Sequence, residues 1–481
     1  ACSPNDPGSP AENNQLNSAA TNVTEAAVII GAESGRQEQL LYARAFEAVI
    51  WATPFLNSLQ MRSELDRLGI KDGKLAFIGS PPSPNLIIPT FNNQTAYVFG
   101  SLSLKDGPLV MEIPAETDKA KLFGTIENIW DDPLIDIGPA GRDKGKGGVY
   151  VVLPPGYEGD VPKDAFVAQS NSFDIHLWFR SVATTKDDKQ SWSDAGDYAR
   201  GIKLGTLGKG PTPVELVDVT KIDSKLEGNI MAHHEVFSLI DTYIQEEPAL
   251  PENLAFRGML KQLGIEKGQD FSPGKKIQAI LDQAKADAFA YMEDYLGSGK
   301  AYVPFWEGRN WGAFRITPEI MENGGTWNLE SHRDYHARTL DFAYWAVGLP
   351  AVFDNSGGGS TFYLFSSTDE TGNGLDGAKT YRLTLPADVP VEDFWSVLLY
   401  STKTRTFTDS PQFGLSSMDD LVVNDDGTID LYIGPKAPKG FEANLLETNP
   451  EEGSFLTFRF YGPTDALTSG AWKLNDPVLV Q

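Results

Sequence analysis

The chain contains a single cysteine, Cys2, so no disulfide can form within it. It also lacks any apolar run close to the ~20 residues that a membrane-spanning helix needs. Basic residues are few, because 40 lysines and arginines stand against 66 aspartates and glutamates, which gives a net charge of −26. A surface with this charge repels phosphate backbones, and we therefore expect no nucleic acid among the partners.

The sequence around Cys2 points to a location. Cys2 follows a small residue, Ala1, and precedes a stretch rich in proline, glycine and asparagine, which predicts a flexible tether over residues 1–22. This arrangement is similar to the mature start of a bacterial lipoprotein, in which the cysteine carries lipid. We therefore expect lipidation at Cys2 as the membrane attachment, and an extracytoplasmic location at the outer membrane or in the periplasm. The alternative is a chance cysteine in a disordered end.

With 481 residues, the chain is longer than most single domains. Strand-like patterns punctuated by turn residues fill residues 74–178 and return from residue 301, whereas residues 184–296 carry helical periodicity. The predicted fold is mainly β with a helical middle, in the α+β class. We expect a β-rich domain with leading helices at 23–183, a helical segment at 184–300 and a β-sandwich domain at 301–481.

Two local predictions refine this pattern. A short helix is expected near Tyr335 to Trp345, where apolar and polar residues alternate at helical spacing. A hairpin is expected around Asp425-Asp426-Gly427, because a turn of this kind lies between two apolar-rich runs, 419–424 and 428–433.

Two stretches carry a family resemblance. The first is Gly138-Pro139-Ala140-Gly141-Arg142 with the glycine-rich residues up to 148, and the second includes Phe394-Trp395-Ser396-Val397 and Tyr432-Ile433-Gly434-Pro435. The chain resembles bacterial proteins that pair the domains of unknown function 1254 (N-terminal) and 1214 (C-terminal). The resemblance implies two antiparallel, jelly-roll-like β-sandwich domains joined by helices, assembly into homo-oligomers, and no settled activity. This family usually has an acid in a segment that here reads Thr90-Phe91-Asn92-Asn93-Gln94-Thr95, so Gln94 is a departure.

Candidate binding residues fall into two groups. Aromatic and charged residues alternate between Tyr302 and Arg315, as they do where ring-shaped ligands are gripped, although such rings also fill junctions between helices and sheets. Acidic, basic and aromatic side chains also share the predicted helix near residue 338, where the alternative is an intrahelical network of ion pairs. The candidates for ligand binding are Trp306, Arg309, Trp311, Asp334, Arg338, Asp341 and Tyr344.

The histidines give only weak evidence for a metal or cofactor site. His332 and His336 are four positions apart, which places both on one face of a helix, beside Glu330 and Asp334. Exposed histidine pairs of this kind are more often plain polar surface, so no metal and no cofactor is expected. The pair His233-His234 lacks the second histidine one turn later that a zinc protease motif requires, which favours a capping or packing role.

We therefore predict that the protein binds a carbohydrate or another polar small molecule in a cleft between its β domains. A hydrolase- or lyase-type enzyme that uses Asp334, Arg338 and Asp341 is the first alternative, with no catalytic residue assigned. A structural protein of the cell envelope is the second alternative. The discriminating observation is whether these side chains line a common pocket.

Overall fold

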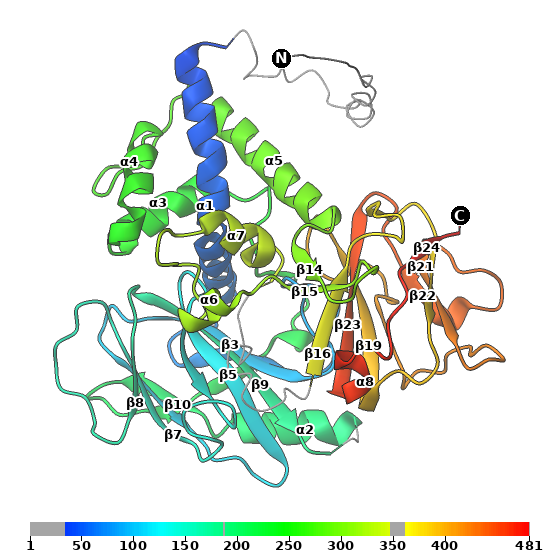
Figure 1. Cartoon of the computed structure of the whole chain (residues 1–481). Helices are drawn as coiled ribbons and strands as arrows, with labels where there is room; N and C mark the ends of the chain where they lie inside the picture. The colour runs from blue at the N-terminus through cyan, green and yellow to red at the C-terminus, as the bar shows by residue number, and fades with distance from the viewer. Residues whose placement is uncertain (1–33, 186–187, 347–360, 481) are drawn as a thin grey trace, which may run out of the picture.

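The structure is a computed structural model and describes residues 34–185, 188–346 and 361–480. Within these ranges it has eight α-helices and several β-sheets, which confirms the α+β class. The long helices gather at one side of the molecule, and the sheets form an N-terminal body below them and a C-terminal body beside them (Figure 1). Cys2 and the expected tether lie outside the described residues, so lipidation stays a prediction, as does the jelly-roll topology of the two β domains.

Helix α1 (Arg36–Arg67) forms the centre of the molecule. All of its residues from Val49 to Met61 are buried, because other elements surround this part of the helix on every side. It contacts α3 (Val236–Glu246), α4 (Leu254–Gln262) and α5 (Lys275–Gly297), and these helices share one apolar core with it. No helix among the described residues combines the length and apolar character needed to cross a membrane.

The N-terminal body contains two sheets with an apolar core between them. The six-stranded sheet has the order β12-β1-β3-β9-β5-β6, and the five-stranded sheet has the order β11-β10-β4-β7-β8. A small parallel pair joins β2 to β13. The strands before residue 184 are β1 (Lys74–Ile78), β2 (Leu86–Ile87), β3 (Ala96–Ser103), β4 (Leu109–Ile113), β5 (Ala120–Asn128), β6 (Pro133–Ile137), β7 (Gly148–Leu153), β8 (Phe166–Gln169) and β9 (Asp174–Ala183).

The middle of the chain differs in part from the helical pattern predicted for it. Helix α2 (Asp188–Ala199) is followed by four short strands, and α3 begins only at Val236. These strands return to the N-terminal sheets, since β10 pairs with β4 and β12 pairs with β1. Runs of two to four residues are too short to show a period of their own, which explains why the sequence did not reveal them. They are β10 (Lys203–Thr206), β11 (Thr212–Pro213), β12 (Glu215–Asp218) and β13 (Leu226–Glu227).

The C-terminal body also has two sheets. The larger follows the order β14-β15-β16-β23-β19-β20, with β17 beside β23, and the smaller follows β22-β21-β18-β24. Their facing sides enclose a separate apolar core. The strands are β14 (Tyr302–Pro304), β15 (Gly312–Phe314), β16 (Thr361–Ser366), β17 (Leu375–Asp376), β18 (Tyr381–Leu385), β19 (Val391–Ser401), β20 (Gly414–Ser416), β21 (Ile429–Gly434), β22 (Leu445–Glu447), β23 (Gly453–Pro463) and β24 (Val478–Leu479).

Of two local predictions, the short helix is confirmed and the hairpin needs correction. The helix expected from Tyr335 to Trp345 is a short α-helix, α7 (Tyr335–Arg338), followed by a π-helical turn, Thr339–Ala343. The turn expected at residues 425–427 exists, because the Asn424 amide donates to the Thr428 carbonyl at 2.8 Å. However, β21 pairs with β18 and not with residues 419–424, so the predicted hairpin does not form. The remaining short helices are α6 (Pro318–Glu322) and α8 (Asp465–Thr468).

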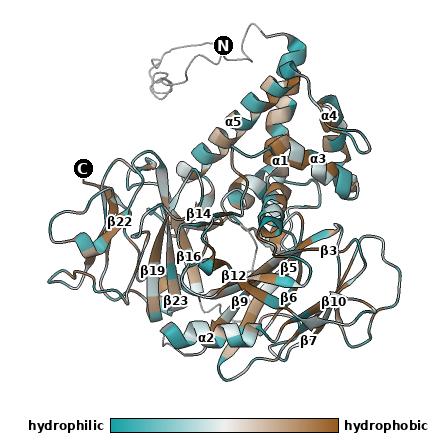
Figure 2. Cartoon of the chain, turned by 180° about the vertical axis from the view of Figure 1, so that it is seen from behind, coloured by the Kyte–Doolittle hydropathy of each residue, from teal (hydrophilic) through white to brown (hydrophobic). Residues whose placement is uncertain are grey.

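Strands β9 and β23 belong to different bodies, and each presents one face to its own sandwich core. Leu177 and Phe179 of β9 point into the N-terminal core, and Phe458 and Phe460 of β23 point into the C-terminal core. Successive side chains of a strand alternate between its faces, so the residues between these positions point away from the core of their own sandwich. From behind, β16, β19 and β23 lie on one side of the centre of the molecule, and β5 and β9 lie on the other (Figure 2).

Candidate functional site

A charged residue occupies the middle of an otherwise apolar strand, β23. Thr457, Arg459 and Tyr461 alternate along this strand with the apolar side chains of the sandwich core, and they therefore share its outer face. Ser396 of β19 and Tyr363 of β16 are the cross-strand partners of Arg459, one on each side. The outer face of the C-terminal sheet is thus polar around Arg459.

The N-terminal sheet supplies a second arginine to the same place. Arg180 of β9 lies directly across from Tyr97 of β3, and its Nη1 donates a hydrogen bond to the Tyr363 hydroxyl at 3.3 Å. The Arg459 guanidinium lies over the ring of the same Tyr363, at 5.1 Å from its centroid. Two guanidinium groups from different bodies therefore meet around one tyrosine. We name this set, with its neighbours Asn92, Thr95, Ser396, Thr457 and Tyr461, the arginine–tyrosine site.

Hydrogen bonds within the site leave many donors unused. Arg459 Nη2 donates to the Thr90 carbonyl at 3.3 Å, to the Phe91 carbonyl at 3.4 Å and to the Tyr400 hydroxyl at 3.0 Å. Its Nε and Nη1 atoms, and Nε of Arg180, are buried without a hydrogen-bond partner. Buried polar groups in folded proteins are nearly all hydrogen-bonded, so a cluster of unpartnered atoms indicates a missing partner. Thr457 Oγ1 is a further buried atom here without a partner. Asn92 and Ser396 lie close enough to the Tyr461 hydroxyl, and Thr95 to that of Tyr97, to oppose the rise of the pKa of these phenols by hydrogen bonding.

The two guanidinium groups also lack a counter-charge. No described carboxylate forms an ion pair with Arg180 or Arg459, whereas Arg62 and Arg338 each have a carboxylate oxygen within 4 Å. Burial raises the pKa of the Tyr97 and Tyr461 phenols, so these hydroxyl groups stay neutral and cannot compensate the positive charge. The arginine–tyrosine site is therefore a positively charged place in a protein of net charge −26.

The side chains of the site differ in exposure. We call the buried ones its floor and the half-buried ones its rim. Arg459 and Asn92 are each only 3% exposed, and Tyr461 is buried as well. Arg180, Tyr97 and Tyr363 are half-buried, so parts of these side chains remain in contact with solvent.

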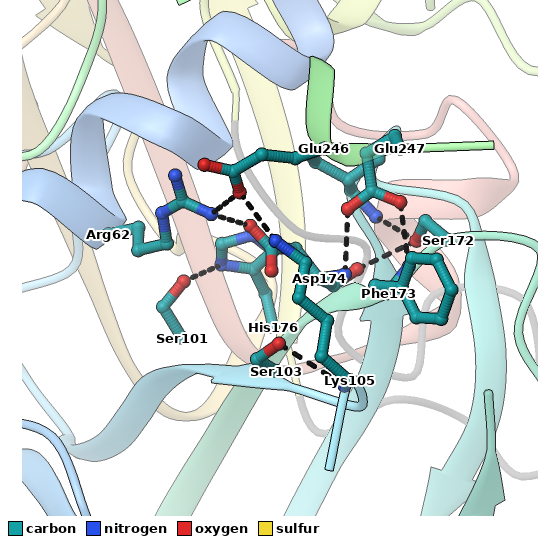
Figure 3. Close-up of polar contacts among 11 residues, drawn as sticks. Arg62, Ser101, Ser103, Lys105, Ser172, Phe173, Asp174, His176, Glu246 and Glu247 are labelled. Carbon is teal, nitrogen blue, oxygen red and sulfur yellow. Dashed lines mark hydrogen bonds and ion pairs between the residues drawn. The ribbon is translucent and has the colours of Figure 1, made fainter. Parts of the chain in front are cut away.

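A second charged cluster lies at the other end of the same face of β9 (Figure 3). Arg62 of α1 forms ion pairs with Asp174 and with Glu246, and Lys105 reaches the same Glu246 oxygen at 2.9 Å. Glu247 accepts hydrogen bonds from the Phe173 and Asp174 amides at 2.7 and 2.9 Å. Each cation here has an acidic partner, so this cluster fastens α1 and α3 to the sheet and does not resemble an open binding site.

Burial dominates the protonation states next to this cluster. It raises the pKa of Glu247 to about 7, against the two backbone hydrogen bonds, and it lowers the pKa of His176 to about 3. It also raises the pKa of Asp131 to about 7, against the positive charge of Arg338. His176, Asp131 and Ser58 line a cavity with about 10 Å³ for the centre of a water molecule, which is room for about one water and not for a substrate.

Of the residues predicted in the aromatic group, the two tryptophans belong to the C-terminal core and Arg309 does not. Trp311 is fully buried in the C-terminal core, where its Nε1 donates to the Asn475 carbonyl at 2.7 Å, and Trp306 is 5% exposed in the same core. Arg309 lies at the surface, where its Nε donates to the Leu474 carbonyl at 3.0 Å. It lines an open, polar cavity of about 300 Å³ together with Glu370, Asn475 and Asp476.

The charged residues predicted near α7 engage separate partners. Asp334 caps α7 by accepting from the Ala337 amide at 3.0 Å. Arg338 is buried, donates to the Trp130 carbonyl at 2.6 Å and stacks over the Trp327 ring at 4.5 Å. Asp341 accepts from the Tyr295 hydroxyl at 3.0 Å and pairs with Arg315 at 3.2 Å, while Tyr344 lies beneath the Arg405 guanidinium at 4.3 Å. These contacts hold the helices and the C-terminal sheet together.

The histidine pair near α7 does not share a helical face, because α7 begins at Tyr335 and His332 precedes the Asp334 cap. His332 Nδ1 lies 2.9 Å from the Ser331 hydroxyl, and His336 Nε2 lies 3.3 Å from the Tyr291 hydroxyl. The prediction of one helical face was wrong, since the helix begins only after its N-cap Asp334 and His332 lies before that cap.

The sequence analysis did not select Arg180, Arg459 or the tyrosines around them. Two signals were available. Arg180 and Arg459 are lone charges within apolar runs that otherwise read as buried strands, Trp178-Phe179-Arg180 and Phe458-Arg459-Phe460. Asn92 and Thr95 belong to the segment 90–95, which the family resemblance had already singled out.

Comparisons with known proteins identify the domains. Residues 77–205 match DUF1254, a protein family of unknown function, and residues 360–465 match DUF1214, a second protein family of unknown function. The chain thus combines a DUF1254 domain and a DUF1214 domain, as its motifs predicted. Of the arginine–tyrosine site, Arg180 lies in the first matched segment and Arg459 in the second.

Two of the solved structures that align with this chain come from bacteria. The VPA0106 protein from Vibrio parahaemolyticus is 17% identical, with a TM-score of 0.49, and the alignment covers 92% of this chain and 100% of that one. An uncharacterised protein from Burkholderia cenocepacia is 14% identical, with a TM-score of 0.37, over 92% of this chain and 94% of that one. No curated protein matches the chain.

Proposed function

We propose that this protein binds a small organic anion that also carries hydroxyl groups, such as a sugar acid, at the arginine–tyrosine site between its two bodies. The observation that carries the proposal is the pair Arg180 and Arg459, which lack an acidic counter-charge among the described residues and whose Nε atoms, together with Nη1 of Arg459, are buried without a hydrogen-bond partner. This proposal keeps the predicted class, a polar small molecule bound between β domains, and gives it a charge and a place.

The energetics favour an anion as the missing partner. Removing an unpaired charge from water costs several kcal/mol in a protein interior, and that cost is recovered only when an opposite charge and matching hydrogen bonds are present. A carboxylate suits this role, because the planar guanidinium fork can donate two parallel hydrogen bonds to its two oxygens. The free Nε and Nη1 atoms of Arg459 lie on different edges of the guanidinium, so each can donate a separate hydrogen bond to an anion.

The neutral groups around the fork suit a ligand with hydroxyl groups. Tyr461, Ser396 and Thr457 provide hydroxyls that both donate and accept, and Asn92 provides an amide N–H. The rings of Tyr97 and Tyr363 at the rim present flat apolar surfaces of the kind that sugar rings stack against. A mixture of one charged fork, several neutral polar groups and two aromatic rings is typical of sites for sugar acids.

The enzymatic alternative loses its main support. Asp334, Arg338 and Asp341 each hold a separate structural contact and do not form a common polar site. A purely structural role is compatible with these contacts, but it leaves the charges of Arg180 and Arg459 without an acidic partner in the described part of the chain. The two interpretations differ in a simple observable, because only the binding protein is stabilised by a ligand.

Thermal unfolding in the presence of matched sugars tests the proposal. D-galacturonate and D-glucuronate should raise Tm, whereas the neutral counterparts D-galactose and D-glucose should not, since they lack the carboxylate. A ligand at 100 times its Kd adds about 2.7 kcal/mol to the free energy of unfolding. Arg459→Met should abolish the shift, and Arg382→Met, on the exposed side of β18, should retain it. Absence of any shift with a panel of hydroxy acids would overturn the proposal.

A further inference from the structure

Three ligand atoms of the type that metals prefer converge in the turn between β13 and α3. His233 Nε2 lies 3.2 Å from Glu227 Oε2, and His234 Nε2 lies 3.5 Å from the same oxygen. Among the described residues, Glu227, His233 and His234 form the one group of three or more histidine, cysteine or acidic side chains whose ligand atoms gather within 4.8 Å. We name this group the histidine–glutamate cluster.

Two of the three distances within the cluster are compatible with the edges of a metal coordination polyhedron. In a tetrahedral zinc site with bonds of about 2.0–2.1 Å, neighbouring ligand atoms are separated by roughly 3.3–3.4 Å. The two distances to Glu227 Oε2, 3.2 and 3.5 Å, bracket this value. Two imidazoles and one carboxylate are also a ligand set that zinc accepts in proteins.

The backbone that carries these ligands is held in place by its neighbours. The Glu227 amide donates to Glu64 Oε2 at 3.0 Å, and its carbonyl accepts from Gln60 Nε2 at 3.0 Å, so both sides of Glu227 are fastened to α1. The His234 carbonyl accepts from Lys285 Nζ of α5 at 3.3 Å. Ligands on a fastened backbone lose little conformational entropy on binding, which favours a preformed site.

The two histidines differ in a way that suits an open metal site. His234 Nε2 is buried and has no hydrogen bond of its own, so a partner for it is missing. The His233 side chain is 58% exposed, so an ion can enter from solvent and a water molecule can complete the coordination. The rings are adjacent, with centroids 4.3 Å apart and an angle of 39° between their planes.

We propose that Glu227, His233 and His234 bind one divalent transition-metal ion, with zinc as the preferred ion and water at the remaining position. The bound ion would tie the loop before α3 to the C-terminal part of α1, because Glu227 is hydrogen-bonded to that helix. The site is independent of the arginine–tyrosine site, with which it shares no residue.

Calorimetric titration of the metal-free full chain with zinc chloride tests this inference. We expect one ion per chain and a rise in Tm with zinc, but no displacement by excess magnesium, which prefers oxygen ligands. His233→Ala and His234→Ala should each weaken binding by at least about 10-fold, as the loss of a ligand does in other sites. The matched control is the double variant His332→Ala and His336→Ala, which should bind zinc as the parent does.

His233→Ala is the decisive variant, because this half-exposed side chain can be removed without disturbing the core. Unchanged affinity in His233→Ala, or loss of binding only in the control variant, would overturn the proposal. Replacement of zinc by cobalt(II) gives a second measurement, since four-coordinate cobalt with histidine ligands absorbs visible light and hydrated cobalt absorbs it only weakly. A spectrum that stays that of hydrated cobalt would also contradict the site.

Discussion

Arg180 of the N-terminal sheet donates a hydrogen bond to the hydroxyl of Tyr363 in the C-terminal sheet, and the two residues lie 183 positions apart in the chain. The contact joins two bodies that each have an apolar core of their own. It also fixes one side of the arginine–tyrosine site, because the Tyr363 ring carries the Arg459 guanidinium on its face. Stability and binding are therefore coupled at this tyrosine.

Tyr363→Phe should separate the two roles of this contact. The substitution keeps the ring under Arg459 but removes the acceptor of Arg180, so it should lower the free energy of unfolding by about 1–2 kcal/mol. Urea unfolding measures the change, and Tyr157→Phe, which removes a surface hydroxyl that donates to the Asp160 carbonyl, is the matched control. Equal stability of Tyr363→Phe and the parent would show that the hydrogen bond does not contribute.

Arg338→Ala should destabilise the protein without removing ligand binding. The substitution leaves the Trp130 carbonyl without its donor and opens a cavity beside Trp327, which together should cost about 2–5 kcal/mol. We expect a lower urea midpoint, together with an unchanged Kd for D-galacturonate at a temperature where the variant is folded. A variant with parental stability and lost binding would return Arg338 to the binding site and contradict its structural role.

Glu247 should make stability depend on pH. Its pKa is raised in the folded protein from 4.5 to about 7, so the folded state keeps a proton that the unfolded state loses over this range. Stability is therefore lost as the pH rises from about 4.5 to about 7. Glu247→Gln does not titrate, and its stability relative to the parent should increase across this window by on the order of 3 kcal/mol, since each pKa unit corresponds to about 1.4 kcal/mol.

Urea unfolding of both proteins at several pH values measures this difference, and all other titrating groups cancel in the comparison. Glu451→Gln, at an exposed position of a turn, is the control and should run parallel to the parent. A constant difference between Glu247→Gln and the parent from pH 4 to pH 8 would mean that the two backbone hydrogen bonds keep Glu247 ionised.

The fold was predictable where local patterns are long. Helix α5 covers the periodic run that begins near Ile277, and the apolar run at Val149 to Leu153 lies in strand β7. Strands β10–β13 were not predicted from the sequence, because they are short and depend on pairing with β4, β1 and β2, which are distant in sequence. The hairpin failed for the same reason, since β21 finds its partner in β18 and not next to the turn.

The polar ligand expected between the β domains stays a prediction. The residues chosen for it near α7 hold contacts between separate elements. Arg180 and Arg459 come together through the register of two separate sheets, and sequence spacing contains no information about such a register. The useful clue was chemical, namely a single charge within an apolar strand.

If Arg180 and Arg459 bind an anionic ligand, calorimetric titration with D-galacturonate should detect it. We expect saturable binding to a single site in the parent chain and in Arg382→Met, and no binding in Arg459→Met. D-galactose should give no heat of binding in any of them. Equal binding of galacturonate by Arg459→Met and the parent, or no binding of any hydroxy acid by the folded parent, would contradict the account.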